Sequence, residues 1–171
     1  MSYLLGELRL RIRSSRCGRD TPSGVDPRDS RVFTLEEVNE LLPKLSVAVK
    51  RQFERRSAIE SLLLQLGREL GDVPERIVLD PSDPTEVRDL KRDVVRRIEE
   101  YRAGWKEIED MGAVLKDART GLLDFYGTVD GKLVWLCWKY GEVEVAHYHA
   151  LEEGYSGRKP IAMSMRYRLL N

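Results

Sequence analysis

The chain has 171 residues, of which 34% are charged and 42% are hydrophobic. Lys plus Arg and Asp plus Glu each number 29, so the formal net charge is zero, and this balance gives no evidence for binding to nucleic acid or to a membrane surface. The length is sufficient for one domain with a hydrophobic core, and no apolar run approaches the length of a membrane-spanning helix.

The composition divides the chain into a leader, a domain and a tail. Residues 1–30 are basic and rich in Ser, Gly, Asp and Pro, so we expect a disordered or loosely docked leader, followed by a single domain over 31–161 and a tail over 162–171. Arginines interrupt the short apolar stretch of the leader, whereas the apolar core of a signal peptide excludes charged residues. Cys17 lies in the leader and Cys137 in an apolar strand, which disfavours a disulfide and favours a reducing, cytoplasmic compartment.

The domain is predicted to begin with an antiparallel helical hairpin over residues 34–112. Thr34 and Glu37 have the spacing of a capping box, which starts the first helix. Pro43 follows in the second or third turn, where we expect a kink. Apolar residues then recur at intervals of three and four along both helices, which favours coiled-coil-like packing: Leu45, Val49, Phe53, Ile59, Leu63, Leu66 and Leu70, then Val87, Leu90, Val94, Ile98, Tyr101, Trp105 and Ile108.

The hydrophobic period changes after Gly112 to one that is typical of strands. Aromatic and β-branched residues are dense here, and two dipeptides, Asp130-Gly131 and Tyr140-Gly141, indicate tight turns. We therefore expect a β-meander over 121–149, whose three antiparallel strands should lie near 121–127, 132–139 and 142–149. A loop rich in Gly and Arg should follow over 150–160. The predicted fold class is α+β, a long helical hairpin packed on a small three-stranded antiparallel sheet.

Two-residue turns at both positions would fix the register of this meander. Asp124 would then lie opposite Cys137, and Cys137 opposite Glu144. The predicted core face carries Leu123, Phe125, Val134, Leu136, Trp138, Val143, Val145, His147 and His149; the other face carries Asp124, Tyr126, Trp135, Cys137, Glu144, Ala146 and Tyr148. This register disfavours a zinc site made of Cys137 and the histidines, although a one-residue bulge in either turn would reverse that conclusion.

The two histidines suggest a metal site. Residues i and i+2 of a strand point to one face, so His147 and His149 together with Glu153 (or its neighbour Glu152) present imidazole and carboxylate ligands suitable for zinc or another divalent ion. The alternative is a pair of histidines that form hydrogen bonds at the edge of the core.

An anion or small-ligand site is the second candidate. Arg158, beside Lys159, and the amides of a turn from Gly154 to Gly157 suit a phosphate or carboxylate, with His149 and Glu153 nearby. The alternative is a structural turn in which Arg158 pairs with Glu152 or Glu153. Nucleophilic catalysis has little support, because no serine stands in an elbow or lysine motif.

Three blocks occur in order along the domain: "FTLEEVNELLPKL", "GAVLKDARTGLLDF" and "LVWLCWKYGEVEVAHYHALEEGYSGRKPI". They resemble a family of uncharacterised bacterial proteins, domain of unknown function 2203, over residues 32–161. The resemblance implies no activity, cofactor or catalytic residue. It implies one histidine followed by an acidic turn and a GxGRxP-like ending, so His149 is the matching histidine and His147 lies outside the pattern.

The leading functional hypothesis is a non-catalytic interaction module. An uncovered helix stripe and the edges of a small sheet would drive formation of a homodimer or binding of a protein partner. The alternative is a protein that binds a small ligand, an anion or a divalent metal, and is conceivably an enzyme, at the loop around His149 and Arg158. The sequence alone identifies no cofactor.

Overall fold

The computed structural model describes residues 31–129 and 131–161. The expected leader and tail, 1–30 and 162–171, lie outside the described residues. The chain divides into two compact units: of the described residues, one unit comprises Lys50–Glu107 and the other comprises 31–49 with 108–161.

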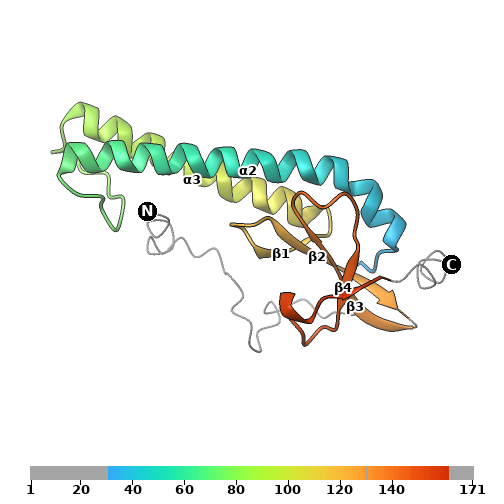
Figure 1. The fold of residues 1–171 in the computed structure, drawn as a ribbon. Coiled ribbons are helices and arrows are strands. Elements are labelled where there is room, and N and C mark those ends of the chain that lie inside the picture. The colour runs from blue at the N-terminus through green and yellow to red at the C-terminus, as the bar shows by residue number, and fades with distance from the viewer. Residues whose placement is uncertain (1–30, 130, 162–171) are drawn as a thin grey trace. The chain divides into compact units, whose positions relative to one another are not determined.

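Two helices occupy the hairpin region, α2 (Leu35–Leu70) and α3 (Thr85–Asp110) (Figure 1). The predicted capping box is confirmed, because the Thr34 amide donates to Glu37 Oε2 at 2.8 Å and the Glu37 amide donates to Thr34 Oγ1 at 3.2 Å. Pro43 lies inside α2 without interrupting it, and a kink at this position stays a prediction. In the part of the chain that the structure describes, no helix has an apolar segment long enough to cross a membrane.

Within the unit Lys50–Glu107, the helices pack as an antiparallel pair. Gln52 Nε2 on α2 donates to the Tyr101 carbonyl on α3 at 2.6 Å. The helices approach closely at Gly104, since a side chain there would collide with Gln52 and Arg55. The apolar stripes are mostly buried; in this unit the buried apolar residues are Ile59, Leu63, Leu66, Val87, Val94, Tyr101 and Trp105.

The second unit contains a five-stranded antiparallel sheet in the order β1-β2-β3-β4-β5. The strands are β1 (Val114–Asp117), β2 (Leu122–Val129), β3 (Lys132–Lys139), β4 (His147–His149) and β5 (Lys159–Pro160). The prediction of three strands was therefore wrong in number. The two additional strands are short and lie at the edges of the sheet, where too few residues pair to leave an alternating pattern in the sequence.

The register of β2 and β3 follows the prediction, whereas that of β4 does not. Val129 pairs with Lys132 across the predicted turn, and Asp124 lies opposite Cys137. On the other side of β3, Cys137 lies opposite His147 instead of Glu144. The difference is three residues, and an odd shift moves every side chain of the strand to the opposite face. Val143, predicted to be in the core, is 96% exposed.

Three contacts explain this shift by keeping the segment before β4 out of the sheet. The Glu142 carboxylate accepts the Lys139 amide at 2.8 Å, and the Glu142 carbonyl accepts Trp138 Nε1 at 2.9 Å. The Val145 amide donates to Asn39 Oδ1 on α2 at 2.9 Å. Because these groups are already satisfied, the chain joins the ladder only at His147.

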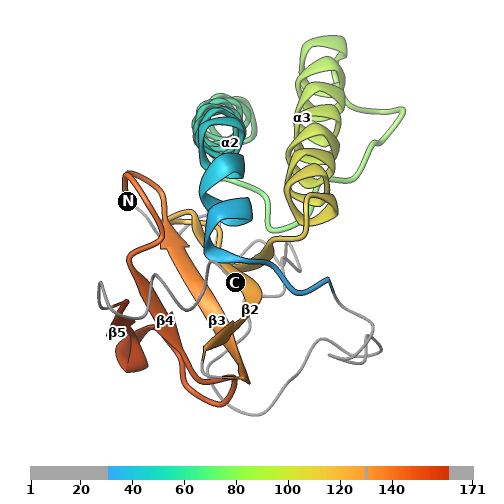
Figure 2. The ribbon, with the colours of Figure 1, turned by 90° about the vertical axis from the view of Figure 1, so that its right-hand side faces the viewer.

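Both faces of the central strands are buried. On one face, the start of α2 lies against the sheet, where the Phe33 ring meets the Phe125 ring edge to face at 5.6 Å and the Phe33 amide donates to the Tyr126 carbonyl at 2.7 Å (Figure 2). Because side chains alternate along a strand, Asp124 and Cys137 point to the opposite face. They are 1% and 0% exposed, so this second face also has an interior.

Candidate metal centre

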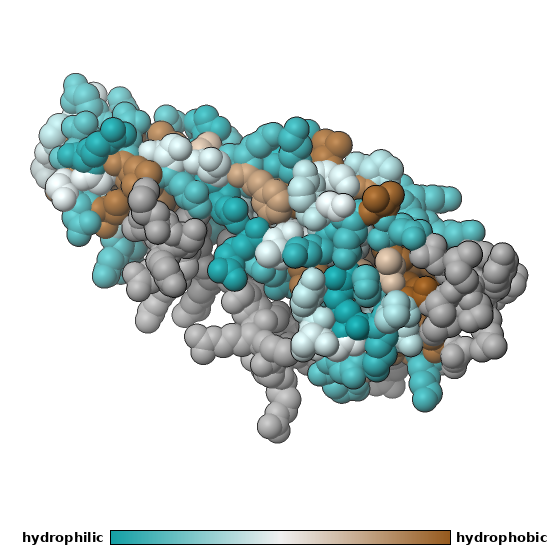
Figure 3. Space-filling model, in the orientation of Figure 1, coloured by the Kyte–Doolittle hydropathy of each residue, from teal (hydrophilic) through white to brown (hydrophobic). Residues whose placement is uncertain are grey.

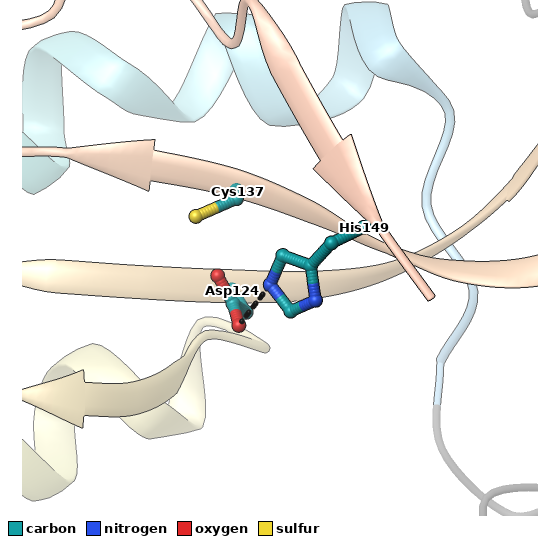
Figure 4. Close-up of side chains that lie close together, drawn as sticks. All are labelled: Asp124, Cys137 and His149. Atoms are coloured by element: carbon teal, nitrogen blue, oxygen red, sulfur yellow. Dashed lines mark hydrogen bonds and ion pairs between the residues drawn. The ribbon is translucent and has the colours of Figure 1, made fainter. Parts of the chain in front are cut away.

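Three neighbouring strands bring Asp124, Cys137 and His149 together on the second face of the sheet. Asp124 comes from β2, Cys137 from β3 and His149 from β4, and their side chains point toward one another (Figure 4). One ligand atom from each residue lies within 4.8 Å of the other two. The residues are 1%, 0% and 2% exposed, so a carboxylate, a thiol and an imidazole share one water-excluded position.

The hydrogen bonds of His149 determine which ring nitrogen faces this position. Nδ1 lies 2.9 Å from the Ala150 carbonyl, which only accepts, so Nδ1 carries a hydrogen. Nε2 lies 3.1 Å from Asp124 Oδ2, which as a carboxylate oxygen also only accepts. A neutral ring would therefore direct a lone pair at a carboxylate. A second proton on Nε2, or a cation held by both atoms, removes this conflict.

The pKa of His149 reflects the same arrangement. Burial opposes protonation, but the hydrogen bonds to Asp124 and Ala150 and the charge of Asp124 outweigh it and raise the pKa of the imidazole above its ordinary value. The site therefore attracts positive charge at Nε2. Carboxylate, thiolate and imidazole are all ligands of zinc and related divalent ions.

Asp124 Oδ1 is buried and forms no hydrogen bond with a nitrogen or oxygen of the described residues. The carboxylate also interacts with the neighbouring Cys137 thiol, which contributes to the raised pKa of that thiol. Ligand atoms of a tetrahedral zinc ion, at bonds of about 2.0–2.3 Å, lie about 3.3–3.8 Å apart. The separation of 3.1 Å between His149 Nε2 and Asp124 Oδ2 is slightly shorter, and all three ligand atoms lie within 4.8 Å of one another. The site therefore combines suitable donors, a spacing near that of zinc ligands and a carboxylate oxygen without a nitrogen or oxygen partner.

Lys116 lies next to the carboxylate because β1 is irregular. The pairing of β1 with β2 shifts between Leu115 and Asp117, which places Lys116 at a bulge, a feature that redirects side chains near functional sites. Its Nζ lies 3.7 Å from Asp124 Oδ2 and 3.9 Å from the centroid of the Trp135 ring. Burial lowers the pKa of Lys116 and the charge of Asp124 only partly offsets this. Lys116 therefore neutralises one carboxylate oxygen from outside the three-residue cluster.

The thiol of Cys137 is not arranged as a free nucleophile. Burial, and then the negative charge of Asp124, raise its pKa well above the ordinary range. A catalytic cysteine needs the opposite shift, because the thiolate is the reactive form. A metal ion, by contrast, stabilises the thiolate directly. The geometry therefore favours a metal ligand over a nucleophile.

The structure brings only part of the predicted metal set together. His149 lies in the cluster, and His147 lies on the same face directly opposite Cys137. The expectation that Cys137 points away from both histidines was wrong, because the three-residue shift reverses the face of β4. Glu153 instead accepts the Ala150 amide at 3.2 Å and pairs with Lys159 at 3.3 Å.

The residues predicted for an anion site form a structural turn. Arg158 pairs with Glu142 at 2.8 Å and donates to the Cys137 carbonyl at 3.3 Å, so its charge is matched by a carboxylate 16 residues earlier and not by the acidic turn at 152–153 that the alternative predicted. Gly154 and Gly157 lie at the ends of a single 3₁₀ turn, Tyr155–Gly157. A side chain at Gly157 would collide with Glu153, which accounts for the glycine.

Asp124 was not among the residues predicted for the site. A signal was present, since "LLDFY" places one acidic residue in the middle of an apolar strand, and an ionisable group there needs a partner. His149 was not recognised as this partner, because the predicted register placed both histidines on the other face.

Comparison with known proteins identifies the family. A family model described as "Uncharacterized conserved protein (DUF2203)" matches residues 31–161. The chain belongs to the DUF2203 family. No curated protein and no solved structure matches this DUF2203 chain. The matched range contains all three residues of the cluster, and the family description names no ligand or activity.

Proposed function

We propose that the protein binds one divalent metal ion of borderline softness, such as Zn²⁺, through Asp124 Oδ, Cys137 Sγ and His149 Nε2. The observation that carries the proposal is the convergence of three buried ligand atoms within 4.8 Å of one another. The orientation of His149 supports it, because its Nδ1 bond to the Ala150 carbonyl directs Nε2 inward.

The mixture of ligands favours zinc over calcium or magnesium. A thiolate and an imidazole are poor ligands for hard cations, which select oxygen atoms, whereas zinc accepts all three donor types. With one carboxylate and one thiolate, the ligands neutralise the charge of a divalent ion. Lys116, whose Nζ lies 3.7 Å from Asp124 Oδ2, adds one positive charge beside this neutral set.

Metal titration of the full, tag-free chain tests this function. After exposure to a strong chelator, we expect the protein to take up about one Zn²⁺ or Co²⁺ per chain, with a thiolate-to-cobalt charge-transfer band and a rise in Tm. Cys137→Ser should abolish the charge-transfer band, and His149→Ala should weaken uptake.

Glu153→Gln is the matched control for these variants. Glu153 belongs to the metal set predicted from the sequence, but its carboxylate is engaged by the Ala150 amide and Lys159. We expect this variant to bind metal like the wild type. Failure of the wild-type chain to bind Co²⁺ or Zn²⁺, with no shift in Tm, would exclude the function.

Self-association is a second candidate. Four apolar side chains of the unit Lys50–Glu107 and its loop favour it, because Leu64, Leu70, Val78 and Leu79 are 40–60% exposed. Against it, most of the stripe expected to recruit a partner is buried, and on the face in Figure 3 apolar side chains form small patches separated by hydrophilic ones. Sizing of the full chain by light scattering tests this candidate; a monomer at all concentrations would exclude it.

A further inference from the structure

We infer that His147 is the fourth ligand of the proposed metal centre, which makes the site a closed Asp-Cys-His-His centre that joins three strands. This inference rests on the proposed function. It adds the number of protein ligands, which determines whether the metal has a catalytic or a structural role. Three-ligand zinc sites leave a position for water or substrate, whereas four-ligand sites are structural.

The first observation is the register of the sheet. Asp124 lies opposite Cys137, and Cys137 lies opposite His147, so the three residues form a row across β2, β3 and β4. Directly opposite residues of antiparallel strands project to the same face with Cβ atoms about 4.5–5.5 Å apart. The His147 ring lies outside the three-residue cluster in this structure, so the imidazole would reach an ion bound to the sulfur of Cys137 by rotation about its side-chain bonds.

The second observation is an unsatisfied ring nitrogen. His147 Nδ1 is buried, and no described residue forms a hydrogen bond with it. A buried imidazole nitrogen without a partner is costly, by about 1–3 kcal/mol. Asp124 Oδ1, in the same row, likewise forms no hydrogen bond with a nitrogen or oxygen of the described residues. One bound cation satisfies both atoms at once.

The third observation is the placement of β4 itself. The segment before it is held by Glu142 and by Asn39, and these contacts bring His147 into pairing with Cys137. His149 follows two residues later on the same face and reaches Asp124 diagonally. A closed centre would therefore lock the three-residue strand β4 to β3 and β2, which its few backbone hydrogen bonds alone hold weakly.

X-ray absorption spectroscopy of the Zn²⁺-loaded, tag-free full chain tests this inference. We expect one sulfur and two imidazoles around zinc in the wild type, and one imidazole in His147→Ala. The variant should bind Zn²⁺ about tenfold or more weakly, and added imidazole should restore the affinity and the cobalt spectrum, which a purely structural loss would not allow.

Tyr148→Phe is the matched control, because Tyr148 is the neighbour of both histidines and projects to the other face of the same strand. It should keep wild-type affinity and two imidazoles. His147→Asn serves as a second variant if the alanine variant does not fold. One imidazole in the wild type, with unchanged affinity in both His147 variants, would overturn the inference and leave a three-ligand site. No metal in the wild type would overturn the proposed function as well.

Discussion

The β2–β3 connection and the β3–β4 connection both contain a glycine turn, but the chain resumes strand pairing at different distances after the two glycines. Each contains a glycine with positive φ, 74° at Gly131 and 97° at Gly141. After Gly131 the chain pairs again immediately at Lys132, whereas after Gly141 it pairs only from His147 onward. The glycine permits a turn in both cases. The register after the turn depends on what the following residues contact.

The two connections differ in their contacts, because the second is held by local bonds of Glu142 to Lys139 and Trp138 and also by residues more distant in the sequence. Beyond Gly141, Glu142 pairs with Arg158, and the Val145 amide is bonded to Asn39, which is 106 residues away. These contacts direct the histidines to the face that holds Asp124 and Cys137. The candidate site therefore exists because the second connection is longer than its local sequence indicates, and this explanation can be tested by removing the contacts one at a time.

The largest effect is expected from Glu142→Ala. This change removes the acceptor of the Lys139 amide and leaves Arg158, whose side chain is 9% exposed, without its partner carboxylate. A loss of about 2–3 kcal/mol in the free energy of unfolding follows from the unpaired, partly buried charge. Urea denaturation measures it, and metal uptake should weaken in parallel because β4 loses its anchor.

Glu152→Ala is the control for that variant, because Glu152 is exposed and lies outside the β3–β4 connection, in the turn after β4. Its free energy of unfolding should change by less than about 0.5 kcal/mol. Equal effects of the two substitutions would mean that Glu142 does not hold the connection.

A smaller effect is expected from Asn39→Ala. The substitution leaves the amide of the buried Val145 without an acceptor, which costs about 1–2 kcal/mol. Hydrogen exchange should show that the Val145 amide loses protection, while the amides of the β2–β3 turn do not. Asn39→Asp retains an acceptor oxygen at the same position and should preserve the protection; loss of protection in both variants would contradict the role given to this bond.

Effects no larger than that of Asn39→Ala are expected from Gly131→Ala and Gly141→Ala. A Cβ would meet no neighbouring atom at either position, so only the positive φ is penalised, by about 1–2 kcal/mol. The two substitutions should therefore destabilise the protein by similar amounts in urea denaturation. A much larger loss at Gly141 alone would show that this glycine, and not the distant contacts, sets the register of β4.

The local signals in the sequence predicted the elements that local chemistry controls. The capping box at Thr34 starts α2, the spacing of apolar residues identifies both helices, and Asp130-Gly131 fixes the register of β2 against β3. Each of these depends on residues within about one or two turns of each other, so their physical basis lies in the printed sequence. His149 was also identified as a candidate residue from its sequence context.

Only the tertiary structure decided the face on which the histidines lie. The side-chain period of a strand is two, so a shift of three residues moves His149 from the predicted core face to the face of Asp124 and Cys137. That shift is produced by the local bonds of Glu142 to Lys139 and Trp138 together with Asn39 and Arg158, and the last two approach the connection only after the chain has folded. Long-range contacts of this kind leave no local pattern, which is why the sequence alone predicted a sheet and two histidines but not the cluster that they help to form.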